Sequence, residues 1–152
     1  MPVYTFAYTE IPIPPSDPFP NGQTACRPYL VAQLVTAAGQ SVTCFVCLDT
    51  GADHCVFPLT FAAALGLDPL QMKMQMTGGV GSVANATYYE AITVRIPIAE
   101  PNGNITTIEF QARVGFTAGM DAQGIGLLGQ LGFFETFPVT FNHKAKAFSI
   151  EA

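Results

Sequence analysis

The stretch that decides the fold is FVCLDTGAD, residues Phe45 to Asp53. Its first four residues are apolar and continue a segment that starts at Ser41, a pattern typical of a strand with a buried face. The strand is expected to end in the turn Asp49-Thr50-Gly51, which presents one carboxylate at the end of the strand. The Asp-Thr-Gly sequence occurs once, and the chain contains no internal repeat that would supply a second carboxylate of this kind.

The composition indicates a folded domain and excludes two classes of partner. The 152 residues suffice for one domain, and hydrophobic residues make up 49% of them against 11% charged residues, which supports a core and argues against disorder. Six Lys and Arg residues and a net charge of −5 do not provide the basic surface that binds nucleic acid. No run of 18 apolar residues is present, so neither a transmembrane helix nor a membrane partner is expected.

The expected compartment follows from the N-terminal sequence and the cysteines. Residues 1–10 have neither the basic region nor the long apolar segment of a signal peptide, so a cytoplasmic location is expected. The four cysteines of the chain are then expected to be free thiols.

Most of the chain is expected to form strands joined by turns, which makes the fold class all-β. A helix is expected at residues 58–67, which begin with a proline and carry a glycine near their end, and a second short helix at residues 130–135. Turns are expected at residues 38–40 and 101–104. The expected strands are residues 3–11, 29–36, 41–48, 71–76, 84–98, 106–116 and 139–150.

A proline-rich segment separates the first expected strand from the rest of the chain. Residues 11–22 contain five prolines and are therefore incompatible with a helix or a central strand. We expect them to form an extended arm. The chain is accordingly divided into an N-terminal strand and arm at residues 1–25 and a domain at residues 26–152.

Three short pieces in a constant order point to a family. The first is the Asp-Thr-Gly turn, the second is the glycine-rich segment MTGGVGS at residues 76–82, and the third is IGLLG at residues 125–129. Together they resemble the retropepsins, the single-domain aspartic proteases of retroviruses and their cellular relatives. The resemblance covers residues 26–152, and the helix-like residues 61–67 make it closer to cellular and prokaryotic members than to viral ones. It implies a closed β-barrel with a flap hairpin, formed by the second piece, and one or two short helices.

The resemblance implies an endopeptidase that acts as a homodimer on an extended peptide or protein substrate. Two carboxylates about 3 Å apart cannot both ionise, so they share a proton, and one acts as a base for water while the other acts as an acid. Asp49 of each chain would supply one carboxylate across a two-fold axis. Thr50 would hydrogen-bond across the dimer, and Gly51 would let the backbone approach the substrate. This chemistry uses no metal, no cofactor and no covalent intermediate.

The resemblance also assigns residues around the catalytic turn. Arg27 would pair with Asp53 of the partner subunit, and Leu128 and Gly129 would lie beneath the turn. Retropepsins usually have an arginine after this glycine, whereas this chain has Gln130, which cannot form a bidentate ion pair with a carboxylate. The residues expected to bind substrate are Ala52, Asp53, His54, Val56, Gly78, Gly79, Val80, Ile125 and Leu127.

Other interpretations of the sequence stay open or fail on context. A non-catalytic peptide-binding or dimerisation module with the same fold is the main alternative. Residues 124–129, GIGLLG, match a dinucleotide-binding fingerprint, but the 23 residues that follow are too few to complete a βαβ unit. Cys44 and Cys47 have the spacing of a zinc or redox pair, but residues three apart on a strand point to opposite faces, so we interpret them as buried free thiols.

Overall fold

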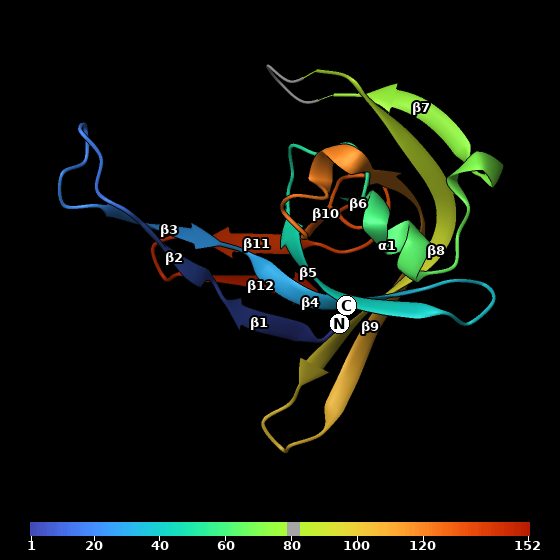
Figure 1. Cartoon of the computed structure of the whole chain (residues 1–152). Coiled ribbons are helices and arrows are strands. Elements are labelled where there is room, and N and C mark those ends of the chain that lie inside the picture. The colour runs from blue at the N-terminus through green and yellow to red at the C-terminus, as the bar shows by residue number, and fades with distance from the viewer. Residues whose placement is uncertain (79–82) are drawn as a thin grey trace. The chain divides into compact units, whose positions relative to one another are not determined.

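The computed structural model describes residues 1–78 and 83–152 (Figure 1). It divides the chain into two units. The larger unit is Leu30–Thr136, and the smaller one combines Met1–Tyr29 with Phe137–Ala152. The Asp-Thr-Gly turn lies in the larger unit, and each unit is described by itself.

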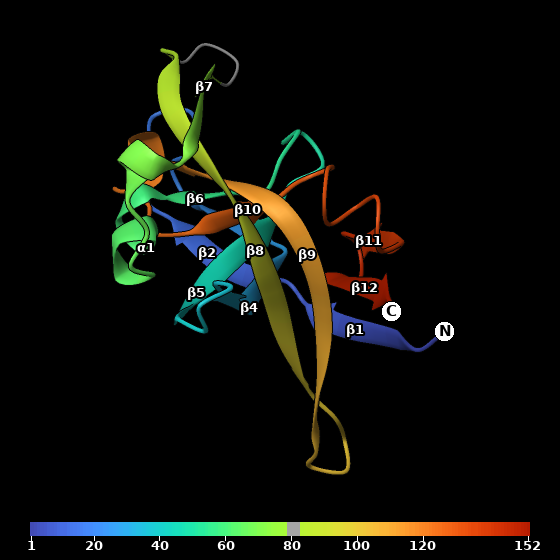
Figure 2. The same cartoon turned by 90° about the vertical axis from the view of Figure 1, so that its right-hand side faces the viewer.

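The larger unit is built on one sheet of seven described strands in the order β4-β5-β10-β6-β9-β8-β7. An additional pairing between β4 and β8 closes six of them into a barrel, while β7 adds to the outer side of β8 (Figure 2). The predicted all-β, closed-barrel fold is therefore confirmed. The strands are β4 (Tyr29–Val35), β5 (Ser41–Leu48), β6 (Val56–Pro58), β7 (Lys73–Thr77), β8 (Asn85–Ala99), β9 (Ile105–Thr117) and β10 (Gly126–Leu128).

The barrel core follows from the two-residue period of its strands. In β4 alternate side chains are buried and in β5 the burial is confined to the end nearest the turn, because successive strand residues point to opposite faces of a sheet. Apolar side chains from every strand of the barrel meet inside it and remove their surface from water. The large side chains buried there include Leu34, Val46, Leu48, Phe57, Ile92, Val94, Ile96, Val114, Phe116 and Leu128.

The strand β8 changes the face that it buries along its length. From Ile92 to Ile98 the even-numbered side chains are buried, whereas near its start Thr87 and Tyr89 are the buried ones. The antiparallel pairing with β9 runs without interruption from Thr87–Thr117 to Ala99–Ile105. The later part of β8 therefore covers the barrel core, and its earlier part presents Thr87 and Tyr89 from the opposite face.

One short α-helix and two 3-10 turns complete the described part of the larger unit. The helix α1 (Leu59–Ala64) is shorter than expected, because Gly66 adopts a φ of 70° and the amides of Gly66 and Leu67 bond back to Ala63 and Ala62, a glycine-terminated helix end. The 3-10 turns are η1 (Pro69–Gln71) and η2 (Ala118–Met120). None of the helices within residues 1–78 and 83–152 combines the length and the apolar character that crossing a lipid bilayer requires.

The second expected helix, at residues 130–135, is wrong. The segment forms consecutive turns instead, because Gly132 has a φ of 104°, which a right-handed helix does not allow. The expected turn at residues 101–104 is confirmed, with Gly103 at a φ of 84° between β8 and β9.

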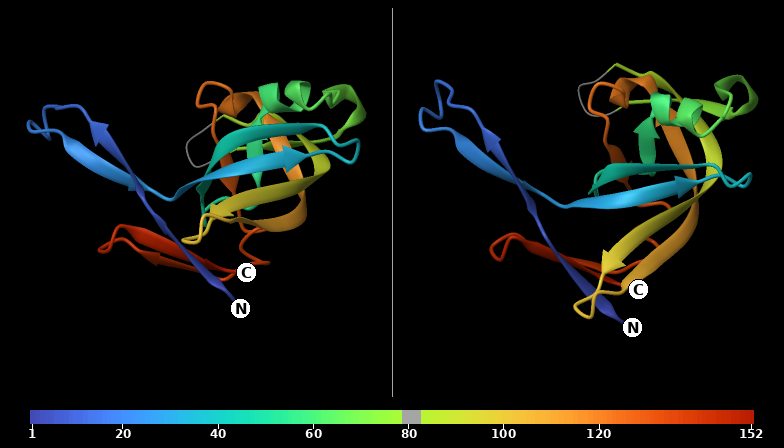
Figure 3. Two further views of the ribbon diagram at one scale, coloured as in Figure 1. Left: turned by 90° about the horizontal axis from the view of Figure 1, so that it is seen from below. Right: turned by 60° about the horizontal axis from the view of Figure 1, so that its bottom comes forward.

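The smaller unit contains two sheets (Figure 3). One has the strand order β1 (Val3–Ala7), β12 (Ala147–Glu151) and β11 (Val139–Asn142), and the rings of Phe6 and Phe148 stack within it at 5.3 Å. The other is a hairpin of β2 (Thr9–Ile13) with β3 (Gln23–Arg27).

Three expectations in the smaller unit are corrected. The expected strand 139–150 is interrupted by a turn at residues 143–146, where Lys146 has a φ of 52°. The expected strand 3–11 is divided at Tyr8. The proline-rich segment is not an extended arm throughout. Its first residues pair in β2, and residues 14–22 connect β2 to β3 in the hairpin. The hairpin tolerates Pro12 because both strands of a two-stranded sheet are edge strands.

Candidate active site

Asp49 lies at the end of β5, and backbone hydrogen bonds hold it there. The strands β5 and β10 pair in parallel with Leu48 opposite Leu128, and the Asp49 amide donates to the Leu128 carbonyl over 3.0 Å. The Gly51 amide donates to the Asp49 carboxylate Oδ1 over 2.9 Å, and the Ala52 amide donates to the Asp49 carbonyl over 3.2 Å. The half-buried carboxylate is therefore oriented by its own turn.

The segment after β10 supports this turn from below. The amides of Gln130 and Leu131 donate to the carbonyls of Ala52 and Asp53, each over 2.8 Å. The Gln130 side-chain amide Nε2 donates to the Thr50 carbonyl over 2.8 Å. A neutral side chain thus braces the turn within one chain, at the position where retropepsins usually carry an arginine.

The Gln130 brace leads to a stability prediction. Gln130→Ala is expected to lower the free energy of unfolding by about 1 kcal/mol, because it removes one hydrogen bond to a carbonyl. Chemical denaturation measures the change. Gln123→Ala, which truncates another exposed glutamine, is the matched control, and an equal loss in both variants would argue against a brace.

The Asp49 carboxylate opens into a groove of about 560 Å³. Six of the expected substrate-binding residues line it, namely Ala52, Asp53, His54, Val56, Gly78 and Leu127. Ile125 is not among its lining residues, and Gly79 and Val80 lie outside the described part of the chain. Arg27 belongs to the smaller unit, where it is exposed on β3 and donates to the Cys26 carbonyl; its expected pairing across a dimer stays a prediction.

The sequence singled out only a small part of the other half of the groove. Residues from β7, the start of β8, the end of β9 and η2 complete it, and of these only Met76 and Thr77 belong to a segment that the sequence assigned to the site, the glycine-rich residues 76–82. Thr117 and Tyr89 are the most informative, because each has a buried hydroxyl without a partner in the described residues. The residues added are Gln75, Met76, Thr77, Asn85, Tyr89, Thr117, Gly119 and Met120.

The Tyr89 side chain lies close to His54 and within reach of the charge of Asp53. Its ring meets the His54 ring edge-on at 5.5 Å. Burial, followed by the negative charge of Asp53, raises the pKa of the Tyr89 hydroxyl. The phenol therefore stays protonated at neutral pH and keeps its hydrogen-bond donor.

The cysteines carry no disulfide. Cys55 is fully buried, whereas Cys44 and Cys47, expected to be buried, are only half-buried. Burial raises the pKa of the Cys44 thiol to about 12. Burial also raises the pKa of Cys55 to about 11, although the backbone amides of Gly129 and Phe133 act in the opposite direction.

The Cys55 pKa predicts slow alkylation. At pH 8 a thiol with a pKa of about 11 holds about one hundredth of the thiolate of a thiol with the ordinary value of 9.0, and the thiolate is the nucleophile. Native Cys55 is therefore expected to react with iodoacetamide at least about a hundred-fold more slowly than in the denatured protein, as followed by peptide mass spectrometry. Equal rates in the two states would contradict the burial of this thiol.

The closed barrel and the Asp-Thr-Gly turn on a central strand define a retropepsin-like fold. Among solved structures, the crystal structure of a retropepsin-like aspartic protease from Rickettsia conorii is similar, with a TM-score of 0.51 and 18% sequence identity over 93% of this chain and 98% of that chain. This likeness confirms the expected retropepsin-like fold. No protein-family model and no curated protein sequence matches the chain.

Proposed function

We propose that this protein is an aspartic endopeptidase that works as a homodimer. The observation that carries the proposal is the Asp49 carboxylate, held at the end of β5 by hydrogen bonds to its own turn and open to a groove lined from two sides. The retropepsin-like fold supports the same function.

The dimer follows from the chemistry. Hydrolysis of a peptide bond needs a base for the attacking water and an acid for the leaving amine. Each chain contains a single Asp-Thr-Gly turn, so a second Asp49 must come from another copy. A two-fold axis beside the turn brings the same residue to itself, and the two carboxylates then share one proton.

The remaining residues take supporting roles in this proposal. Thr50 links the two turns across the dimer, and Gly51 allows the substrate backbone to approach. The expected flap is residues 76–82, of which 79–82 lie outside the described part of the chain, and an extended substrate binds as an added strand. Val56 and Leu127 give the groove apolar walls, so we expect large apolar side chains on either side of the cleaved bond. A cytoplasmic location fits four cysteines that form no disulfide.

The test is cleavage of a mixed peptide library between pH 3 and 7, with the mass of the protein in solution measured in parallel. The proposal expects a dimer that cleaves peptides preferentially beside apolar residues. A folded dimer that binds peptides and cleaves none would favour the non-catalytic peptide-binding module. A monomer without activity at every concentration would remove the basis of the shared Asp49 site.

A further inference from the structure

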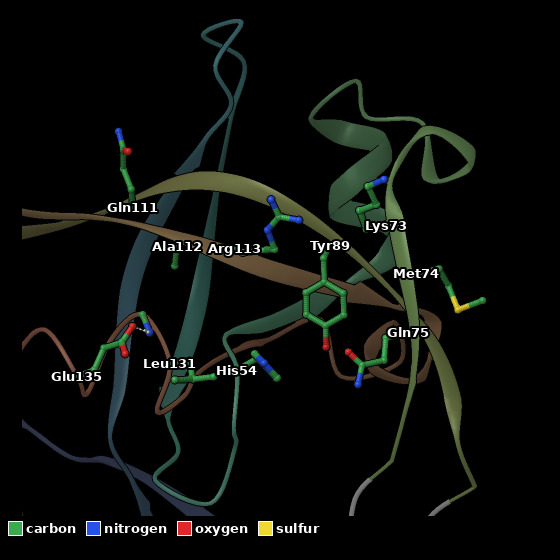
Figure 4. Close-up of a pocket in the computed structure, with 11 residues that line it drawn as sticks. His54, Lys73, Met74, Gln75, Tyr89, Gln111, Ala112, Arg113, Leu131 and Glu135 are labelled. Atoms are coloured by element: carbon green, nitrogen blue, oxygen red, sulfur yellow. Dashed lines mark hydrogen bonds between the residues drawn. The ribbon is translucent and has the colours of Figure 1, made fainter.

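A second pocket of about 590 Å³ adjoins the Asp49 groove (Figure 4). The two cavities share three lining residues, His54, Gln75 and Tyr89. Neither Asp49 nor Gly51 lines the second pocket. A peptide that extends along the groove past Tyr89 would therefore reach this pocket with a side chain distant from the cleaved bond, because each residue of an extended strand advances the chain by about 3.3 Å.

The second pocket is positively charged in an acidic protein. Residues 30–136 contain three basic side chains, of which Arg95 forms a 2.7 Å salt bridge with Glu109. The other two, Lys73 and Arg113, make no salt bridge within the described residues, and both line this pocket. Figure 4 shows both on the upper side of the pocket.

The carboxylate that lines the pocket, Glu135, already accepts a backbone hydrogen bond. Glu135 accepts a 2.7 Å hydrogen bond from the Gly132 amide. Two cations against one carboxylate give the pocket lining a net positive charge, although the chain as a whole carries a charge of −5 and Asp53 of the adjoining groove acts on the shared residue Tyr89. An anionic group therefore meets two available cations in this pocket.

An unpartnered hydroxyl lies where the pocket and the groove meet. Tyr89 is 8% exposed, and its hydroxyl has no hydrogen-bond partner in the described residues. Figure 4 shows the Tyr89 ring turned toward His54 and Gln75. A buried donor of this kind is costly to leave without an acceptor, and a bound peptide would supply one once the Tyr89 ring turns to bring the hydroxyl to the pocket surface.

We propose that this pocket is a distal substrate subsite that binds an acidic side chain of the peptide. Lys73 and Arg113 pair with its carboxylate, and the Tyr89 ring turns so that its hydroxyl donates to the peptide at the entrance from the groove. The assignment rests on the proposed peptidase function and adds to it a substrate class: peptides with apolar residues at the cut and an Asp or Glu at one remote position.

The first test uses peptide pairs that carry Glu or Gln at one position, moved stepwise away from the cut. The wild type is expected to show a roughly five-fold higher kcat/KM for Glu at one remote position, because an exposed charge pair is worth up to about 1 kcal/mol. The preference is expected to shrink at high salt, which screens exposed charges.

Variants assign the preference to the pocket. Lys73→Met combined with Arg113→Gln is expected to abolish the Glu preference, and Lys73→Arg is expected to keep it. Arg95→Gln, which removes the basic residue already paired with Glu109, is the matched control and is expected to retain the preference. A preference that survives the double variant would overturn the assignment.

Binding measurements separate this inference from the proposed function. Fluorescence anisotropy with the Asp49→Asn protein reports the affinity for the same labelled peptides without hydrolysis. Tighter binding of the Glu peptide, lost in the double variant, supports the subsite even if the wild type cleaves nothing. Equal affinity for all Glu and Gln peptides, or no binding, overturns the subsite even if the wild type is an active peptidase.

Discussion

Asp49→Asn is expected to lower the rate of peptide hydrolysis at least about a thousand-fold, with the fold and the dimer retained. Asparagine has the shape of aspartate, and its carbonyl oxygen can still accept the Gly51 amide that the Asp49 carboxylate accepts at 2.9 Å. It cannot exchange a proton with water or with the leaving amine, and general acid–base catalysis contributes about 10²–10⁴-fold for each group. In a homodimer the substitution removes both groups together.

The control for this variant is Asp68→Asn. Asp68 lies outside the groove and caps the turn η1 through its carboxylate, a role that asparagine also fulfils. This variant is expected to retain the wild-type kcat/KM on the best peptide from the library. Thermal unfolding and light scattering show whether each variant is folded and dimeric, and an Asp49→Asn dimer with more than a tenth of the activity would place catalysis on another residue.

The sequence predicted the elements whose pattern is local. The bounds of β5 were predicted correctly because an apolar segment ends sharply in a polar turn. The two long strands β8 and β9 were predicted to within one residue at each end, since a Pro-Asn-Gly-Asn turn separates two alternating segments. The position of Asp49 at a strand end followed from the same local pattern.

The sequence did not predict the elements that depend on distant partners. The strands β6 and β10 have three residues each, too few to show a period, and they exist because they pair with each other and with β5 and β9. The sequence did not predict that Tyr89 and Thr117 line the groove, for a similar reason. Their positions depend on the register between β8 and β9 and on the change of buried face along β8. Neither feature can be predicted from a short sequence motif.

Gly129→Ala is expected to cause the largest loss of stability among the substitutions near the site. A Cβ atom at position 129 would lie 2.3 Å from the His54 carbonyl oxygen and 2.6 Å from that of Ala52. Both are backbone atoms and cannot rotate away, so the turn or the segment beneath it must move. Overpacking of this kind costs about 1–3 kcal/mol and sometimes more, and the movement also strains the hydrogen bond from Gln130 to Ala52. We therefore expect a loss of about 3 kcal/mol in the free energy of unfolding.

Gly103→Ala separates this close approach from the general effect of replacing a glycine. Gly103 has a φ of 84° and nothing within 4 Å of an added Cβ, so its replacement costs about 1–2 kcal/mol through backbone conformation alone. Denaturant unfolding of both variants measures the difference. Losses of equal size would mean that the segment below the catalytic turn yields easily. A larger loss of unfolding free energy for Gly129→Ala, together with reduced peptide cleavage, would support a specific role for the segment at Gly129. The catalytic turn would then hold Asp49 in place only while that segment packs directly against the turn.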